Sequence, residues 1–326
     1  MAARRWLLIA TSLLPLTTWT LAIAQTAARV WRIGLIHVGN DHMPPSYEPM
    51  RASMRALGYE EGRNIRYDFR NVADEVAALE AARAFVRERV DLIVAFDQEA
   101  CSAAHMATTT LPIVVVHAAD PIASGFGKSL ARPGGNMTGF AGRAELPAKE
   151  LEMLREIAPK LSRVLLLFDS RDAASLSLRR DARTAAGILG VTLVEREARD
   201  LPTLNTVFEK LKPGTAEAVL ITSTSIRHRF QKPVLALATA RAMVMVGSRQ
   251  DMVEAGALFS YSYDLAKVGR LTASRYVDRI LKGKKPADLP IEEMTEYQFV
   301  VNRGVAKRHG WTFPEAVLLR AHRIVE

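Results

Sequence analysis

Polar residues follow several apolar stretches of the sequence, each at the point where the stretch ends. Their hydroxyl, amide, imidazole and charged groups can hold a small polar molecule through hydrogen bonds and opposite charge. In open α/β sheets ligands bind beyond the carboxyl ends of the strands. The candidate ligand-binding residues are therefore Gly39, Asn40, Asp97, Gln98, His117, Asp120, Ser170, Thr222, Ser223, Arg249, Tyr261 and Tyr263. For each polar residue the competing interpretation is a cap on the next helix.

The sequence lacks the common patterns of enzyme chemistry. The stretch 125–129 (GFGKS) resembles the end of a phosphate-binding loop, but that motif needs a glycine where Ile122 stands. No G-x-S-x-G, G-x-G-x-x-G or H-E-x-x-H pattern occurs. We therefore expect no catalytic residue, no cofactor and no metal site. An exported enzyme remains an alternative.

The basic excess is dispersed. The 326 residues include 44 Lys and Arg against 35 Asp and Glu, a net charge of +9. These charges occur in runs of mixed sign, such as 195–199 (EREAR), without interleaved aromatic residues. Such runs are typical of solvated faces, so we expect no nucleic-acid partner. The single cysteine, Cys101, excludes an internal disulfide and is predicted to be buried and unreactive.

Residues 1–24 are predicted to be a signal peptide. Arg4 and Arg5 precede an apolar run that ends in Ala22-Ile23-Ala24, which gives the basic start, apolar middle and A-x-A cleavage site of an export signal. We expect cleavage near Ala24 and a periplasmic protein. It would not be a lipoprotein, because no cysteine follows the run. A membrane anchor and, for export, the twin-arginine route are the alternatives.

The mature chain alternates short apolar runs with helical periodicity, which is typical of βαβ units and a mostly parallel sheet. Strands are predicted at 30–38, 65–69, 92–96 and 113–116, and helices lie between them. A stretch rich in turn-forming residues at 131–136 indicates a boundary. The alternation then resumes, with strands at 164–168, 191–194, 218–222, 243–246 and 258–261. We therefore predict two consecutive α/β lobes of similar size, each with an open, mostly parallel sheet, and a ligand cleft between them.

Four stretches resemble the tryptophan/tyrosine-type (TrpX-like) family of ABC transporter substrate-binding proteins. They are 119–139 (ADPIASGFGKSLARPGGNMTG), 57–64 (LGYEEGRN), 276–290 (YVDRILKGKKPADLP) and the tail from Val301 to Ala321. The resemblance covers almost the whole mature chain. It implies a periplasmic-binding-protein class I fold of two Rossmann-like lobes, a small ligand held between the lobes, and delivery to an inner-membrane permease powered by a separate ATPase. We expect lobe 1 to contain residues 30–140 plus about 263–292, and lobe 2 to contain 141–262 plus about 293–326.

The sequence departs from the family at two places in the candidate site. Asp97-Gln98-Glu99 stands where small neutral residues are usual, and Tyr261-Ser262-Tyr263 where Tyr-Gly is common. We therefore expect Asp97 to face a ligand amine, and Arg249 or backbone amides to hold a carboxylate, which suits an amino acid or a related acid. Tyr261 or Tyr263 would stack on an aromatic ligand.

The function predicted from these features is capture of the ligand by hinge closure. We expect the exported protein to be a monomer. A soluble sensor that presents its closed form to a membrane receptor is the alternative.

Overall fold

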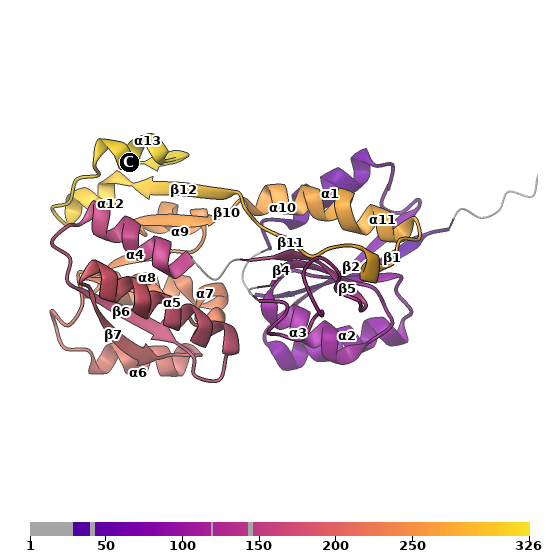
Figure 1. The fold of residues 1–326 in the computed structure, drawn as a ribbon, viewed down its shortest axis with the longest axis horizontal. Helices are drawn as coiled ribbons and strands as arrows, with labels where there is room; N and C mark the ends of the chain where they lie inside the picture. The colour runs from indigo at the N-terminus through magenta and orange to yellow at the C-terminus, as the bar shows by residue number, and fades with distance from the viewer. Residues whose placement is uncertain (1–28, 40–42, 119, 143–145) are drawn as a thin grey trace, which may run out of the picture.

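Two α/β halves lie side by side in the computed structural model, which describes residues 29–39, 43–118, 120–142 and 146–326 (Figure 1). The first sheet has the order β11-β5-β4-β3-β1-β2, and all of its pairings are parallel. Its strands are β1 (Trp31–Val38), β2 (Ile65–Val72), β3 (Leu92–Ala95), β4 (Ile113–Ala118), β5 (Met137–Ala141) and β11 (Glu292–Glu293). Its helices are α1 (Tyr47–Ala56), α2 (Glu75–Arg87), α3 (Gln98–Ala107), α10 (Leu265–Leu271), the π-helix η1 (Thr272–Val277), α11 (Asp278–Leu281) and the 3₁₀ turn η2 (Pro286–Asp288).

The second sheet has the order β13-β12-β10-β9-β8-β6-β7 and is parallel except between β10 and β12. Its strands are β6 (Arg163–Phe168), β7 (Thr192–Glu197), β8 (Ala218–Ile221), β9 (Val244–Gly247), β10 (Phe259–Tyr263), β12 (Tyr297–Asn302) and β13 (Arg323–Val325). Its helices are α4 (Leu146–Ile157), α5 (Ala173–Leu189), α6 (Leu201–Lys210), α7 (Thr224–Arg229), α8 (Gln231–Thr239), α9 (Gln250–Ala255), α12 (Arg303–Arg308) and α13 (Glu315–Arg320). The predicted fold class is confirmed.

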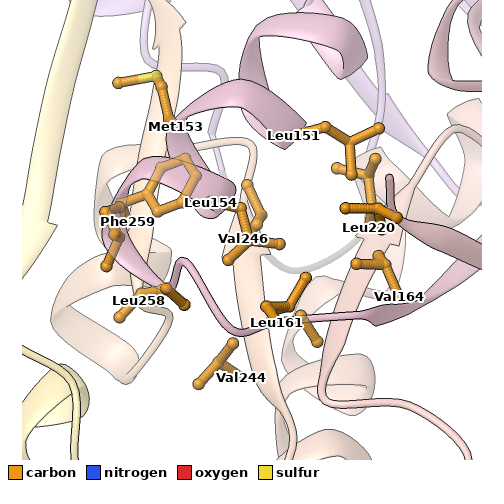
Figure 2. Packing of buried hydrophobic residues seen from close by; sticks show 14 of the residues in the cluster. Leu151, Met153, Leu154, Leu161, Val164, Leu220, Val244, Val246, Leu258 and Phe259 are labelled. Carbon is orange, nitrogen blue, oxygen red and sulfur yellow. The ribbon is translucent and has the colours of Figure 1, made fainter. Parts of the chain in front are cut away.

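Each sheet is covered on both faces. Successive residues of a strand point to opposite faces, so Leu35 and Ile36 of β1 belong to two different apolar clusters. In the second sheet, Leu165 and Leu166 of β6 are divided in the same way. Figure 2 shows part of one of these clusters, in which Leu154 of α4 packs over the sheet. This burial on both faces explains why the strands read as continuous apolar runs.

The chain passes between the halves three times: after β5, between β10 and α10, and between β11 and β12. The turn-rich stretch 131–136 is therefore not the boundary, because β5 follows it and pairs with β4 of the first sheet. A turn is nevertheless required there, since Gly134 has a φ of 73°. Late in the chain, α10, η1 and α11 return to pack on the first sheet, in the same cluster as β1.

Cys101 is fully buried in the core of the first half, as predicted, and burial raises the pKa of its thiol. The predicted signal peptide lies outside the described residues. Within the part of the chain that the structure covers, no helix is long and apolar enough to cross a membrane.

Candidate functional site

A polar cavity of about 740 Å³ lies where the two halves face each other. It is bordered by the first turns of α2, α3 and α5, which begin directly beyond the carboxyl ends of β2, β3 and β6. The polar residues that line it are Asp74, Glu75, Gln98, Glu99, Ser102 and Ser124 from the first half, and Asp169, Arg171, Asp172, Arg199, Ser225 and Arg229 from the second. Positively and negatively charged side chains therefore line the same cavity.

An ion pair crosses this cavity from one half to the other. Arg229, the last residue of α7, places Nη2 3.5 Å from Glu99 Oε1 on α3. Its Nη1 donates a hydrogen bond to the backbone oxygen of Ala73 at 2.9 Å. Burial raises the pKa of Glu99 to about 7, against the opposing effect of the Arg229 charge. Among the described residues, Glu99 Oε2 and Arg229 Nε have no hydrogen-bond partner.

Asp97 lies beside this pair in the sequence, but its hydrogen bonds are within the first half. Its Oδ1 accepts from the Ala100 amide as the N-cap of α3, and its Oδ2 accepts from the Val38 amide, both at 2.8 Å. The same Oδ2 lies 2.8 Å from Nδ1 of His37. Burial alone would raise the pKa of Asp97, but these hydrogen bonds and the His37 charge hold it below its ordinary value. Gln98, the next residue, does line the cavity and donates to Ser124 Oγ at 3.2 Å.

His117 and Tyr263 meet at the junction of the halves, with ring centroids 5.8 Å apart. Burial lowers the pKa of His117 to about 4, and the charge of Arg227 acts in the same direction. The imidazole is therefore neutral at neutral pH. Gly142 allows this close packing, because a β-carbon there would lie 3.0 Å from His117 Nε2.

A second cavity, of about 460 Å³, contains two more of the predicted residues, Arg249 and Tyr263. Arg249 donates from Nε and Nη2 to the carboxylate of Asp251 at 3.0 and 2.9 Å. Asp97 lines neither this cavity nor the first. The structure therefore does not bring the predicted amine-binding and carboxylate-binding residues into one cavity.

The other predicted residues have local roles in the structure. Tyr261 stacks on Tyr297, with centroids 4.7 Å apart and planes at 7°. The Oγ1 of Thr222 donates to the Leu167 oxygen at 3.1 Å, and Ser223 is the N-cap of α7.

Ser170 donates from Oγ to Glu197 Oε1 at 2.8 Å, and Asp120 accepts from the Ala123 amide at 2.9 Å. The amide of Gly39 donates to the Val72 oxygen at 3.2 Å. Asn40 lies outside the described residues.

Sequence reasoning missed Arg229, and it named Glu99 only as a departure from the family pattern. Arg229 lies between the strands predicted at 218–222 and 243–246, where the structure has two helices, α7 and α8. The buried pair of Glu150 and Arg227 was also missed, with Oε1 and Nη2 2.7 Å apart and side chains only 1% and 12% exposed. Contacts between residues so distant in sequence carry no local signal. Within the described part of the chain, no group of three potential metal ligands gathers.

Comparison with known proteins gives a consistent result. The model of the family "ABC transporter substrate binding protein" matches residues 35–325. A tyrosine-binding protein of Clostridioides difficile is 25% identical over 251 residues, which are 77% of this chain and 72% of that protein.

Solved structures of similar fold include a conserved domain protein of Vibrio cholerae, with a TM-score of 0.80 at 26% identity over 91% of this chain and 100% of the other. An ABC domain from Streptococcus pneumonia in complex with L-Trp also has a TM-score of 0.80, at 23% identity and with the same two coverages. The ligand-free, open structure of a substrate-binding protein with adhesive properties from Clostridium difficile has a TM-score of 0.65 at 25% identity, over 91% and 99% of the two chains.

Proposed function

Since this chain belongs to the family of ABC transporter substrate-binding proteins, we propose that it captures an amino acid, aromatic in its side chain, between its two halves and delivers it to a membrane permease. The observation that carries this proposal is the polar cavity of about 740 Å³, to which the first half contributes acidic side chains and the second half both acidic and basic ones. An amino acid carries one charge of each sign, so such a cavity suits it. The ligands named for two relatives, tyrosine and L-Trp, support the same class.

Capture would proceed by closure. The ligand contacts both halves only when they meet, so it favours the closed form by its difference in affinity for the two forms. The higher TM-score to the L-Trp complex than to the open, ligand-free relative supports the view that the halves are arranged here much as in a ligand-bound protein. The proposed lobes are residues 30–140 with about 263–292, and 141–262 with about 293–326.

The protein would work without catalysis as a monomer in the periplasm, after removal of residues 1–24. The twelve residues predicted from the sequence remain proposals as ligand contacts. For two of them, Asp97→Ala and Arg249→Ala, calorimetry would measure the change in affinity. Unchanged affinity in both variants would exclude the assigned pair.

The ligand class itself is tested on the purified mature protein. Native mass spectrometry would identify a retained ligand. A thermal-shift panel of the twenty amino acids and of aromatic acids would rank these compounds by how far each raises the melting temperature. We expect L-tryptophan or L-tyrosine to raise the melting temperature in proportion to the logarithm of its concentration above Kd. A panel in which no amino acid raises the melting temperature would contradict the proposal.

A further inference from the structure

Glu99 and Arg229 form a charged pair whose hydrogen bonds are incomplete. The contact of 3.5 Å between Oε1 and Nη2 is longer than the roughly 2.7–2.9 Å usual for a charge-assisted hydrogen bond. Among the described residues, Oε2 of the carboxylate and Nε of the guanidinium have no partner, although both atoms are buried. Leaving a buried polar atom unpaired is unfavourable, because the atom has lost its hydrogen bonds to water. A group that supplied the missing hydrogen bonds would therefore bind favourably.

The position of the pair restricts what that group can be. Both side chains line the 740 Å³ cavity, one from each half, and each is less than one-fifth exposed. The Arg229 guanidinium is held in place by the Ala73 oxygen. An α-amino acid carries its ammonium and its carboxylate on one carbon atom, so its opposite charges are separated by only a few ångströms. That spacing matches a carboxylate and a guanidinium that lie 3.5 Å apart.

Neighbouring carboxylates are less suited to the same task. The oxygens of Asp97 already accept hydrogen bonds from Val38 and Ala100 and face His37 within the first half. Glu75 lines the cavity but is exposed to water, where an ion pair contributes little.

We propose that Glu99 and Arg229 determine specificity for the amino-acid head group: the Glu99 carboxylate accepts hydrogen bonds from the ligand ammonium, and the Arg229 guanidinium donates to the ligand carboxylate. This inference rests on the proposed function, because it requires an amino-acid ligand. Since the two residues belong to opposite halves, the head group would join the halves directly. The direct contact between Glu99 and Arg229 would then be replaced by two contacts to the ligand.

The test compares complete and truncated head groups. Calorimetry would measure the Kd of L-tryptophan, of indole-3-propionate, which lacks the ammonium, and of tryptamine, which lacks the carboxylate. If L-tyrosine is the better ligand in the panel, 3-(4-hydroxyphenyl)propionate and tyramine replace them. Wild type should prefer the amino acid over each analogue by about tenfold or more, as expected for a hydrogen bond to a charged group.

Each variant should lose one preference and keep the other. In Glu99→Gln, the Kd of the analogue without the ammonium should come to within about threefold of the Kd of the amino acid. In Arg229→Gln, the Kd of the amine, which lacks the carboxylate, should do the same. Glu99→Asp and Arg229→Lys retain the charges and should recover part of each preference. Glu80→Gln, an exposed glutamate of α2 outside the cavity, is the matched control and should leave both ratios unchanged. Circular dichroism would confirm that each variant is folded.

The outcomes separate the two proposals. If wild type binds an amino acid and both Gln variants keep the wild-type ratios, the assignment of Glu99 and Arg229 is wrong while the proposed function stands. If no amino acid binds to wild type, both proposals fail.

Discussion

Glu99 is an acidic residue whose buried position has a consequence for stability. Burial raises its pKa from an ordinary value of 4.5 to about 7. The native protein therefore binds this proton more tightly than the unfolded chain does. The stability that this provides is complete below pH 4.5 and is lost as the pH rises through about 7. Arg229 opposes the shift, while Asp97, Glu75 and Asp172 reinforce it.

We expect Glu99→Gln to remove this pH dependence. Without ligand, the melting temperature of the variant minus that of wild type should increase as the pH rises from 5 to 8, because Gln has no charge to desolvate. The pKa shift of Glu99 corresponds to at most about 3 kcal/mol in the free energy of unfolding. Scanning fluorimetry across that range measures this difference in melting temperature, with Glu80→Gln as the exposed control. A gap that stayed constant with pH would show that Glu99 titrates normally.

The buried ion pair between Glu150 and Arg227 should contribute strongly to the stability of the protein. Both side chains are buried, and Arg227 Nη1 also donates to the Ile221 oxygen at 2.9 Å. Glu150→Gln would leave a buried guanidinium without its counter-charge, which costs about 3–5 kcal/mol. Glu152→Gln on the same helix removes only the exposed pair with Lys149 and should cost less than about 1 kcal/mol. Urea unfolding followed by circular dichroism measures both, and equal losses would contradict the interpretation.

At the scale of elements, α10 can approach α1 only because it carries Gly269. A β-carbon at this position would lie 2.2 Å from the backbone oxygen of Ser46, and neither backbone can easily move. Gly269→Ala should therefore destabilise the protein by about 1–3 kcal/mol. The matched control is Gly187→Ala in α5, where a β-carbon would meet nothing within 4 Å.

The control should be neutral or more stable by up to about 1 kcal/mol, because alanine loses less entropy in a helix than glycine does. Chemical denaturation distinguishes the two substitutions. If Gly269→Ala were as well tolerated as Gly187→Ala, the helices would have to separate without cost.

Helices and strands with a clear hydrophobic pattern were predicted well from the sequence. Strands that depend on hydrogen bonds to a neighbouring strand were not. The strands predicted at 92–96 and 164–168 each differ by one residue from β3 and β6. The strand β5 was missed, because Gly139 and the turn-forming residues before it do not favour a strand. It forms because its neighbour β4 supplies hydrogen bonds along its length. Likewise β12 exists through its antiparallel pairing with β10.

The candidate site was only partly predictable for a related reason. Residues that follow strands could be identified from the sequence, and Gln98, Arg249 and Tyr263 do line cavities. Which of these residues share a cavity depends on how the two sheets face each other. The pair of Glu99 and Arg229, which are 130 positions apart, depends on that arrangement entirely.

At the scale of the whole molecule, closure predicts a change of shape with ligand. Small-angle scattering of the mature protein should give a smaller radius of gyration with saturating ligand than without it. The expected reason is that contacts to both halves select the closed form. Arg229→Gln should need more ligand for the same compaction, because one contact across the cavity is lost. No compaction with a ligand of confirmed affinity would contradict closure.

The three passages of the chain between the halves also limit the order in which the halves can fold while the chain is being synthesised from its N-terminus. The cluster on one face of the first sheet is completed by Tyr276, Val277 and Leu281, and the sheet's edge strand is β11 at 292–293. A chain that appears from its N-terminus therefore presents β1 to β5 long before α10, η1 and α11, which complete the cover of one face. The first half must wait, with that face covered only in part by α1, until about nine-tenths of the sequence has been released. The half that begins first is thus unable to finish before the strands β6 to β10 of the other have appeared.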